Sequence, residues 1–332
     1  MHHRRPTILD VARAAGVSRA TASRVINNVP GASDVVRSRV HQVVADLGYR
    51  PNEIARALAS GRRGVVDLVV FAPDPGLSWL GVHPYYSRVL AGMMPVLDGR
   101  DAQLRVHVAQ ADGSAAVIDT VAEAATAGAV LVNVPPELAL RFHARCRRVV
   151  SLAATADRVP AVDAENAAGA YAAVSHLHRL GRRRIAAVHG PASNSCAADR
   201  RVGYLAAVRD LGLPGINADG GFIREGGHRA ALQLLADHPD IDGLFVACDL
   251  MGAGAVQAIT AAGRKIPDDV AVIGFDDSIA ATCSNPPLTT VRLPVEEMAA
   301  EATSALLDGT VTPGWRRMFT VELVVRESAG PA

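Results

Sequence analysis

The side chains whose types and spacing most clearly suggest a binding role lie near the start of the chain, between Thr7 and Asn27. Here basic, small and polar side chains gather away from the apolar positions: Arg19, Ala20, Thr21, Ser23, Arg24 and Asn27. An arginine can hold a guanine edge through two hydrogen bonds, and the side chains of Ser, Thr and Asn reach phosphates. If a helix presents them, this face can lie in the major groove of DNA. The alternative is an ordinary helical hairpin with a solvated face.

Two short helices joined by a tight turn are predicted to carry these residues. Thr7 can cap the first helix, and Asp10 three residues later completes a capping box. Gly16 can adopt the left-handed conformation that stops the first helix, and Ser18 can cap the second. Apolar residues recur at helical spacing in both: Ile8, Val11, Ala12 and Ala15, then Ala22, Val25 and Ile26.

A third helix is predicted to begin at Ser33 and to stop at Gly48, which would complete a small three-helix domain. Its inward side chains would be Val36, Val40, Val43, Val44 and Leu47. The next segment has Pro51 at a first helical turn and Gly61 after its end. It is too short to be a stable helix alone in water.

The charges are divided unevenly along the chain. Residues 1–63 hold 11 Arg and 4 acidic residues, a net charge of +7. The whole chain has 34 basic and 33 acidic residues, so the remainder holds 23 and 29, a net charge of −6. We therefore expect binding to nucleic acid by the N-terminal end alone, with a steep dependence on salt.

Beyond residue 64 the pattern changes to apolar, Val-rich runs that alternate with amphipathic helices. This alternation is typical of a doubly wound α/β core with parallel sheets, in which ligands bind at the carboxyl ends of the strands. The expected strands are 65–71, 104–108, 129–134, 148–152, 184–189, 243–247 and 270–275. The clearest helices are 85–97, 168–180, 197–211, 227–236 and 250–261.

Other features exclude several classes of protein. The leader MHHRRP has no apolar run behind its basic residues, and no later stretch approaches a membrane span, so we expect a cytoplasmic protein. We find no GxGxxG, P-loop or GxSxG motif and expect no enzyme activity, cofactor or metal. We expect reduced and mostly buried thiols, because the cysteines lack zinc-like spacing: Cys146, Cys196, Cys248 and Cys283.

The N-terminal motifs resemble the DNA-binding headpiece and hinge of the LacI/GalR family of bacterial transcription regulators. The matching residues are Asp10 to Ala12, Ala15 to Ser18, Thr21, Ser23 to Val25, Asn27, Leu47 to Asn52 and Ala55 to Leu58. Later segments resemble the effector-binding core of the family: HRLGRRRIAAVHGP, RxxGY at 200–204, DLMGAGAVQAI, IPDDVAVIGFDD and PPLTTVRLPVEEM.

This resemblance implies an all-α helix-turn-helix headpiece and an α/β two-lobed core like that of periplasmic binding proteins. The headpiece would cover residues 1–49, the hinge helix and linker 50–63, and the effector-binding and dimerisation core 64–332. Within the core, the N-lobe would take about 64–160 plus 291–318 and the C-lobe about 161–290 plus 319–332.

The resemblance also assigns roles on DNA. Arg19 and Ala20 would begin the base-reading helix, and Arg24 would be a further base contact. Leu58 would be a wedge in the minor groove, with Ala55 close by, although an ordinary apolar contact in a linker is the alternative. The residues that would position the phosphates are Thr7, Ser18, Thr21, Ser23, Asn27, Ser33, Tyr49 and Asn52.

A small effector between the lobes is implied in the same way. Arg200 and Asp276 would clamp it, Phe222 would stack on it, and Tyr85 with Tyr86 would supply an aromatic pair. The simpler alternatives are that Arg200 pairs with Asp199 or with an acid across the lobe, and that Phe222 belongs to the core.

Two departures from the family suggest an effector unlike that of the best-known sugar repressors. Cys248 stands at a position of this site where many members have Asn. The segment between Pro73 and Tyr85 is longer than usual and adds Trp79 and His83.

Together these implications predict a homodimer that binds a roughly palindromic operator in double-stranded DNA, as a repressor more readily than as an activator. A sugar or sugar derivative is the first expectation for the effector, and a nucleoside or purine the next. A regulator that acts without an effector is the main alternative. A periplasmic solute-binding protein would need an export signal. The C-terminal end lacks a long heptad tail, which favours a dimer over a tetramer.

Overall fold

The computed structural model describes residues 6–26, 32–47, 64–72, 81, 83–110, 112–153 and 156–330. The chain divides into two compact units, residues 1–62 and 63–332. We call the first the headpiece and the second the core. Among the described helices, none is long and apolar enough to cross a membrane.

The headpiece contains the expected helices α1 (Ile8–Ala14), α2 (Arg19–Ile26) and α3 (Asp34–Asp46). The capping box is confirmed, because the Thr7 hydroxyl accepts from the Asp10 amide at 3.4 Å and the Asp10 carboxylate accepts from the Thr7 amide at 2.8 Å. Gly16 has a φ of 61°, as the turn requires. Buried Val11, Ala15, Val25 and Val40 hold the helices together.

Two details of α3 differ from the sequence prediction. The helix begins at Asp34, one residue later than predicted, and Ser33 precedes it in an extended conformation without a side-chain capping hydrogen bond. Leu47 was expected to point inward and is instead exposed, because α3 ends at Asp46 and Leu47 is the residue that follows the last turn. Val40 is fully buried as predicted, with Val36, Val43 and Val44 packed against the same cluster.

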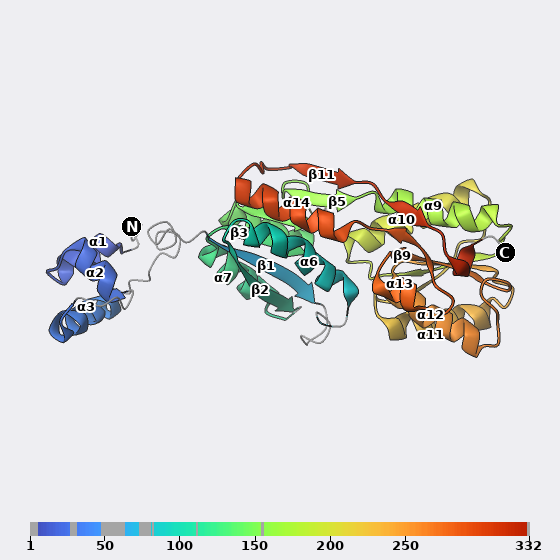
Figure 1. The fold of residues 1–332 in the computed structure, drawn as a ribbon, viewed down its shortest axis with the longest axis horizontal. Coiled ribbons are helices and arrows are strands. Elements are labelled where there is room, and N and C mark those ends of the chain that lie inside the picture. The colour runs from blue at the N-terminus through green and yellow to red at the C-terminus, as the bar shows by residue number, and fades with distance from the viewer. Residues whose placement is uncertain are drawn as a thin grey trace. The chain divides into compact units, whose positions relative to one another are not determined.

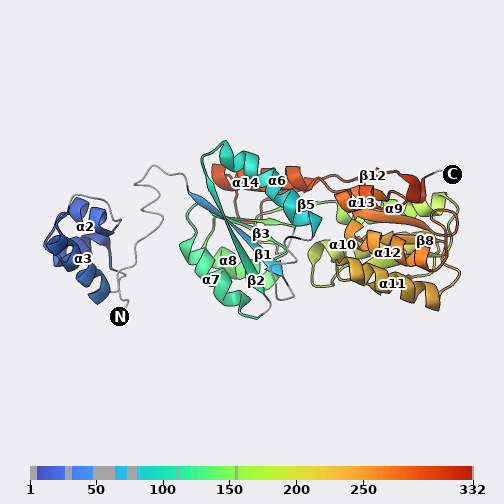
Figure 2. The ribbon, with the colours of Figure 1, turned by 60° about the horizontal axis from the view of Figure 1, so that its bottom comes forward.

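The first sheet of the core has six strands in the order β11-β5-β4-β3-β1-β2, all paired in parallel. The strands are β1 (Val65–Ala72), β2 (Gln103–Gln110), β3 (Gly128–Val132), β4 (Val149–Leu152), β5 (Ala161–Ala164) and β11 (Arg316–Phe319). Helices α6 (Pro84–Asp98) and α14 (Val295–Asp308) lie side by side on one face (Figure 1). The other face packs against α7 (Ser114–Ala124) and α8 (Pro136–Arg145), as Figure 2 shows.

The second sheet has the order β12-β10-β9-β8-β6-β7, and only β12 runs antiparallel to its neighbour. The strands are β6 (Ile185–His189), β7 (Ile216–Asp219), β8 (Gly243–Val246), β9 (Ala271–Asp276), β10 (Thr289–Arg292) and β12 (Glu322–Val324). One face carries α9 (Asn166–Arg179) and α10 (Ser195–Asp210), and the other carries α11 (Arg224–Asp237) and α12 (Asp249–Ala261) (Figure 1). The short helices α13 (Ile279–Cys283) and η1 (Glu327–Ala329) follow β9 and β12.

The fold class is therefore the predicted one, with two doubly wound lobes. The chain crosses between the sheets after β5, after β10 and after β11. The first crossing follows Ala164, a few residues beyond the boundary at 160 expected from the sequence, because β5 is part of the first sheet. The second follows Arg292, since β10 pairs with β9 in the second sheet.

Close packing of α9 on α10 positions the centre of the core. Gly203 lies so near α9 that a Cβ atom there would come within 2.0 Å of the Ala167 carbonyl oxygen. Only glycine permits this approach. Because Arg200 lies one turn earlier on α10, the same contact brings its side chain toward the start of α9, at the crossing between the lobes.

Candidate functional site

In the headpiece, α2 presents the predicted polar face. Arg19, Ala20 and Arg24 are exposed, whereas Ala22 and Val25 are fully buried on the opposite side. Ser18 caps the helix, since its hydroxyl accepts from the Thr21 amide at 3.0 Å.

The charges on this face are not neutralised within the headpiece. Among the described residues, neither Arg19 nor Arg24 makes an ion pair, although most arginines of the core do. Two unpaired guanidinium groups on a capped, exposed helix suit an anionic partner. Several expected DNA contacts lie outside the described residues: Asn27, Tyr49, Asn52, Ala55 and Leu58.

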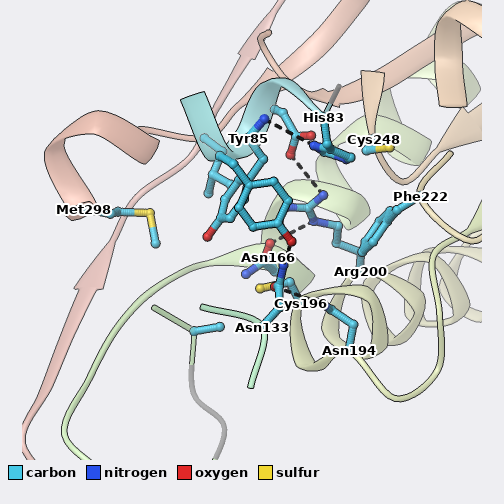
Figure 3. A pocket seen from close by; sticks show the side chains of 14 residues that line it. His83, Tyr85, Asn133, Asn166, Asn194, Cys196, Arg200, Phe222, Cys248 and Met298 are labelled. Carbon is cyan, nitrogen blue, oxygen red and sulfur yellow. Dashed lines mark hydrogen bonds and ion pairs between the residues drawn. The ribbon is translucent and has the colours of Figure 1, made fainter. Parts of the chain in front are cut away.

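The core has a cavity between its lobes, with about 520 Å³ of empty space that includes open solvent. It lies at the carboxyl ends of the strands of both sheets, where ligands bind in folds of this kind. All six expected effector-site residues line it: Tyr85, Tyr86, Arg200, Phe222, Cys248 and Asp276. Figure 3 shows these side chains together with others that the sequence analysis missed.

Arg200 is the central polar group of the cavity (Figure 3). Its Nη1 donates to Asp276 Oδ1 at 3.1 Å and to the Ala247 carbonyl at 2.5 Å, and its Nε donates to Asn166 Oδ1 at 2.9 Å. The guanidinium also lies 3.7 Å from the ring centre of Phe275. Arg200 therefore pairs with Asp276 rather than with Asp199, and the pair is buried, with side chains 4 % and 8 % exposed.

Asp276 is held at the end of β9 in an unusual backbone conformation, with a φ of 111°, and Asp277 follows with a φ of 54°. Such values are uncommon for residues with a Cβ and persist only where the surroundings impose them. Here Arg292 and Arg326 hold the Asp277 carboxylate at 2.7 and 2.5 Å. Burial raises the pKa of Asp276, and the guanidinium groups of Arg200 and Arg88 oppose that rise.

Aromatic rings also line the cavity, and Phe222 lies beside Arg200 (Figure 3). His83 caps α6 through its Nδ1, which accepts from the Tyr85 amide at 3.2 Å. Its ring meets those of Tyr85, Tyr86 and Phe222 edge to face, at 6.0 to 6.5 Å between centres. Phe222 belongs to the second lobe, so the His83–Phe222 contact spans the cleft. Phe222 also packs against the buried hydrophobic cluster of the second lobe. It therefore both lines the cavity and contributes to the packing of its lobe.

A chain of amides also spans the cleft. Asn133, which follows β3, donates to the Tyr86 hydroxyl at 2.8 Å and accepts from Asn194 Nδ2 at 2.9 Å. Asn194 in turn caps α10 by accepting from the Ala197 amide at 3.1 Å. The helix that carries Arg200 is thus connected to the first lobe through side chains that line the cavity.

Arg88 ties the lobes together beside the cavity. From α6 it donates to both oxygens of Glu296 at 2.7 Å, to the Leu293 carbonyl at 3.0 Å and to the Asp276 carbonyl at 2.6 Å. Asp276 therefore bonds Arg200 through its side chain and Arg88 through its backbone. A ligand that shifts Asp276 would act directly on α6 of the other lobe.

The cysteines differ in their surroundings. All four are free thiols; Cys248 is buried, Cys146 and Cys196 are half-buried, and Cys283 is exposed. The expectation of mostly buried thiols was therefore only partly right. Cys196 and Cys248 both line the cavity, and burial raises the pKa of both thiols, that of Cys196 to about 12.

Behind the cavity, Asp249 is a fully buried carboxyl group. It accepts from Thr290 Oγ1 at 2.6 Å and from the Ser278 amide at 2.7 Å. Burial, and then the nearby charge of Asp276, raises its pKa to about 8. A folded-state pKa above the unfolded value of about 3.9 means that ionisation opposes folding.

The contribution of Asp249 to stability is therefore fully present below about pH 4 and is lost as the pH rises toward 8. An Asn side chain has nearly the same shape as Asp but does not ionise. The free energy of unfolding of Asp249→Asn should therefore fall less between pH 5 and 8 than that of the wild type. The difference in slope is at most about 1.4 kcal/mol per pH unit. Urea unfolding at several pH values measures it, with exposed Asp240→Asn as the control. Equal slopes for Asp249→Asn and the wild type would refute the assignment.

The sequence analysis missed the amides of the cavity and one of its thiols: Asn133, Asn166, Asn194 and Cys196. Asn133 was placed inside a predicted strand, and Asn166 follows β5, which the pattern did not reveal. Asn194 and Cys196 were within reach, because they lie in the loop and first turn after a predicted strand. Of the two additions in the long segment, His83 lines the cavity and Trp79 lies outside the described residues.

A helix-turn-helix unit followed by a two-lobed α/β core with a cavity between the lobes defines a class of DNA-binding transcription regulators. Residues 7–52 match the family "Bacterial regulatory proteins, lacI family", and residues 174–329 match "Periplasmic binding protein-like domain". The chain is 34% identical to the HTH-type transcriptional regulator CelR of Thermobifida fusca, over 98% of each protein. It is 33% identical to GalR of Escherichia coli, over 97% of this chain and 95% of GalR.

The chain therefore belongs to the LacI family. It is a DNA-binding transcriptional regulator with an effector-binding domain, and not an enzyme. Among solved structures, a CelR–cellobiose complex matches 98% of this chain and 100% of that chain, with a TM-score of 0.73 and 32% identity. A Lac repressor dimer bound to operator and the anti-inducer ONPF has a TM-score of 0.74 at 24% identity, with coverage of 99% and 100%, and shares the fold.

Proposed function

We propose that this protein is a cytoplasmic, homodimeric repressor whose affinity for a roughly palindromic operator is controlled by a small molecule in the interlobe cavity. The observation that carries the proposal is the cavity itself, where Asp276 bonds Arg200 on one side and Arg88 on the other. A sugar or sugar derivative is the first candidate for the effector, and a nucleoside or purine is the second. The relative CelR is known as a complex with cellobiose, which supports a sugar.

On DNA, α2 would lie in the major groove, with Arg19, Ala20 and Arg24 toward the bases. The phosphate contacts would come from Thr7, Ser18, Thr21, Ser23 and Ser33, and from Asn27, Tyr49 and Asn52 outside the described residues. The net charge of +7 in residues 1–63 supports this arrangement. Two headpieces would read two half-sites of the operator.

Leu58, with Ala55 beside it, is the proposed minor-groove wedge. Leu58→Ala should weaken specific binding roughly tenfold or more and nonspecific binding much less, because kinking of the operator depends on an apolar side chain between base pairs. Fluorescence anisotropy with operator and random DNA measures both affinities. The control is Leu9→Ala, since Leu9 is an exposed leucine of α1. Equal losses on both DNAs would argue against a wedge.

The effector would act by changing the angle between the lobes. A ligand that moves Arg200 and Asp276 would also move α6, because Arg88 on α6 is bonded to the Asp276 carbonyl. The first lobe, which contains α6, follows the linker and headpiece directly in the chain. Operator and effector must then change each other's affinity by the same factor, because the two equilibria are linked.

A regulator that works without an effector is the second candidate. It is favoured by the way the cavity groups satisfy each other, Arg200 with Asp276 and Asn133 with Asn194.

A thermal-shift screen of the whole protein separates these candidates, with a panel of sugars, sugar phosphates, polyols, nucleosides and purines. A ligand that binds the folded state must raise the melting temperature. The proposal predicts a hit that is lost in Asp276→Ala and kept in Asp240→Ala, an exposed position. If no compound acts, the effector-free regulator is favoured.

A further inference from the structure

The cavity offers a ligand no net charge. Among its described lining residues, Arg200 and Asp276 are the charged pair, and they neutralise each other. Burial, and then the charge of Arg200, lowers the pKa of His83 to about 4, so its ring is neutral at pH 7. A phosphate or carboxylate on the ligand would lose its hydration next to the Asp276 carboxylate, and the cavity has no unpaired cation to compensate for that loss. The charge balance of the cavity therefore selects uncharged ligands.

Three lining residues of the cavity have groups left for hydrogen bonds. Among the described residues, Arg200 Nη2, Asp276 Oδ2 and the Tyr85 hydroxyl have no hydrogen-bond partner. Arg200 Nη2 is a donor, Asp276 Oδ2 is a strong acceptor, and the Tyr85 hydroxyl can donate or accept. Neighbouring hydroxyls of a sugar ring match this set. The aromatic ring of Phe222, which meets that of His83 edge to face, can cover the apolar face of such a sugar.

Two thiols also line the cavity, on different sides of Arg200 (Figure 3). Cys196 lies one turn before Arg200 on α10, and Cys248 follows Ala247, whose carbonyl accepts from Arg200 at 2.5 Å. Burial keeps both thiols protonated. A thiol is a weak donor and a weak acceptor, so a ligand hydroxyl pressed against it would lose water without an equal replacement. The ligand surface beside the thiols should therefore consist of C–H groups.

We propose that the effector is an uncharged deoxy sugar, with hydroxyls toward Arg200 and Asp276 and a hydroxyl-free part of its surface toward each of the thiols of Cys196 and Cys248. This inference rests on the proposed effector-binding function and narrows the class of its ligand.

Matched pairs of sugars test the inference by titration calorimetry on the full chain. The pairs are galactose with 6-deoxygalactose, mannose with 6-deoxymannose and glucose with 2-deoxyglucose, beside hexose 6-phosphates, uronic acids and nucleosides. One deoxy sugar should bind roughly 10- to 100-fold tighter than its parent, which is the range a pocket achieves against an added hydroxyl. The charged sugars should not bind.

Substitution of the two thiols provides a second test of the inference. Cys248→Ser and Cys196→Ser each place a hydroxyl partner in the cavity, so each should reduce the preference for the deoxy sugar about tenfold. Cys283→Ser, at the exposed cysteine, should leave it unchanged.

Two different failures can be told apart. If a parent hexose, a charged sugar or a nucleoside binds best and shifts operator affinity, the deoxy-sugar inference is overturned and the effector function stands. If no compound binds or changes operator affinity, both are overturned.

Discussion

Arg200→Ala is expected to abolish the response of the protein to its effector and to lower the stability of the core. The substitution removes the donor aimed into the cavity and leaves the Asp276 carboxylate buried without its partner. Breaking a buried ion pair in this way costs about 3–5 kcal/mol. The expected result is a lower melting temperature that the effector no longer raises, measured by thermal shift on the same ligand panel.

The neighbouring arginine provides a matched control. Arg201 lies on the same helix and pairs with Asp219, but their side chains are 34% and 72% exposed. Exposed pairs contribute about 0–1 kcal/mol, so Arg201→Ala should keep both stability and ligand response. If Arg200→Ala retained the ligand-induced shift, Arg200 would not be part of the effector site.

The second large effect is expected in the headpiece. Arg24→Ala should lose discrimination between operator and random DNA, because an arginine that holds a guanine by two hydrogen bonds contributes about 1–3 kcal/mol of specificity. A dimer would lose this in both half-sites. Competition binding at fixed salt measures the ratio of specific to nonspecific affinity, which should fall roughly tenfold or more for each half-site.

Arg13→Ala is the control for Arg24→Ala. Arg13 is also exposed and basic, but it lies in the last turn of α1 and not on α2. Its loss should weaken binding to both DNAs alike, as expected for removal of a general positive charge. If Arg24→Ala behaved in the same way, Arg24 would be a phosphate contact and not a base contact.

Local signals were sufficient to predict the headpiece. The capping box of Thr7 and Asp10, the left-handed Gly16 and the spacing of the apolar residues depend only on neighbours in sequence. The start of the third helix at Ser33 was one residue early and the inward position of Leu47 was wrong, since both lie at ends of α3, where helix boundaries are hard to place from sequence.

The core was predictable where strands are long or strongly apolar, as in β1 and β9. The four-residue strands β5, β7 and β11 are too short and too polar to show a period, and their places depend on pairing with distant strands. For the same reason the polar bridge from Asn133 to Asn194, which joins residues far apart in sequence, could not be foreseen.

The central claim is that the cavity and the operator-binding surface are coupled, and operator affinity measured with and without the effector tests it most directly. The two affinities should differ by a factor of roughly 5–150, and saturating operator DNA should change the affinity for the effector by the same factor. A ligand that binds in the cavity, requires Arg200 and yet leaves operator affinity unchanged would contradict the account.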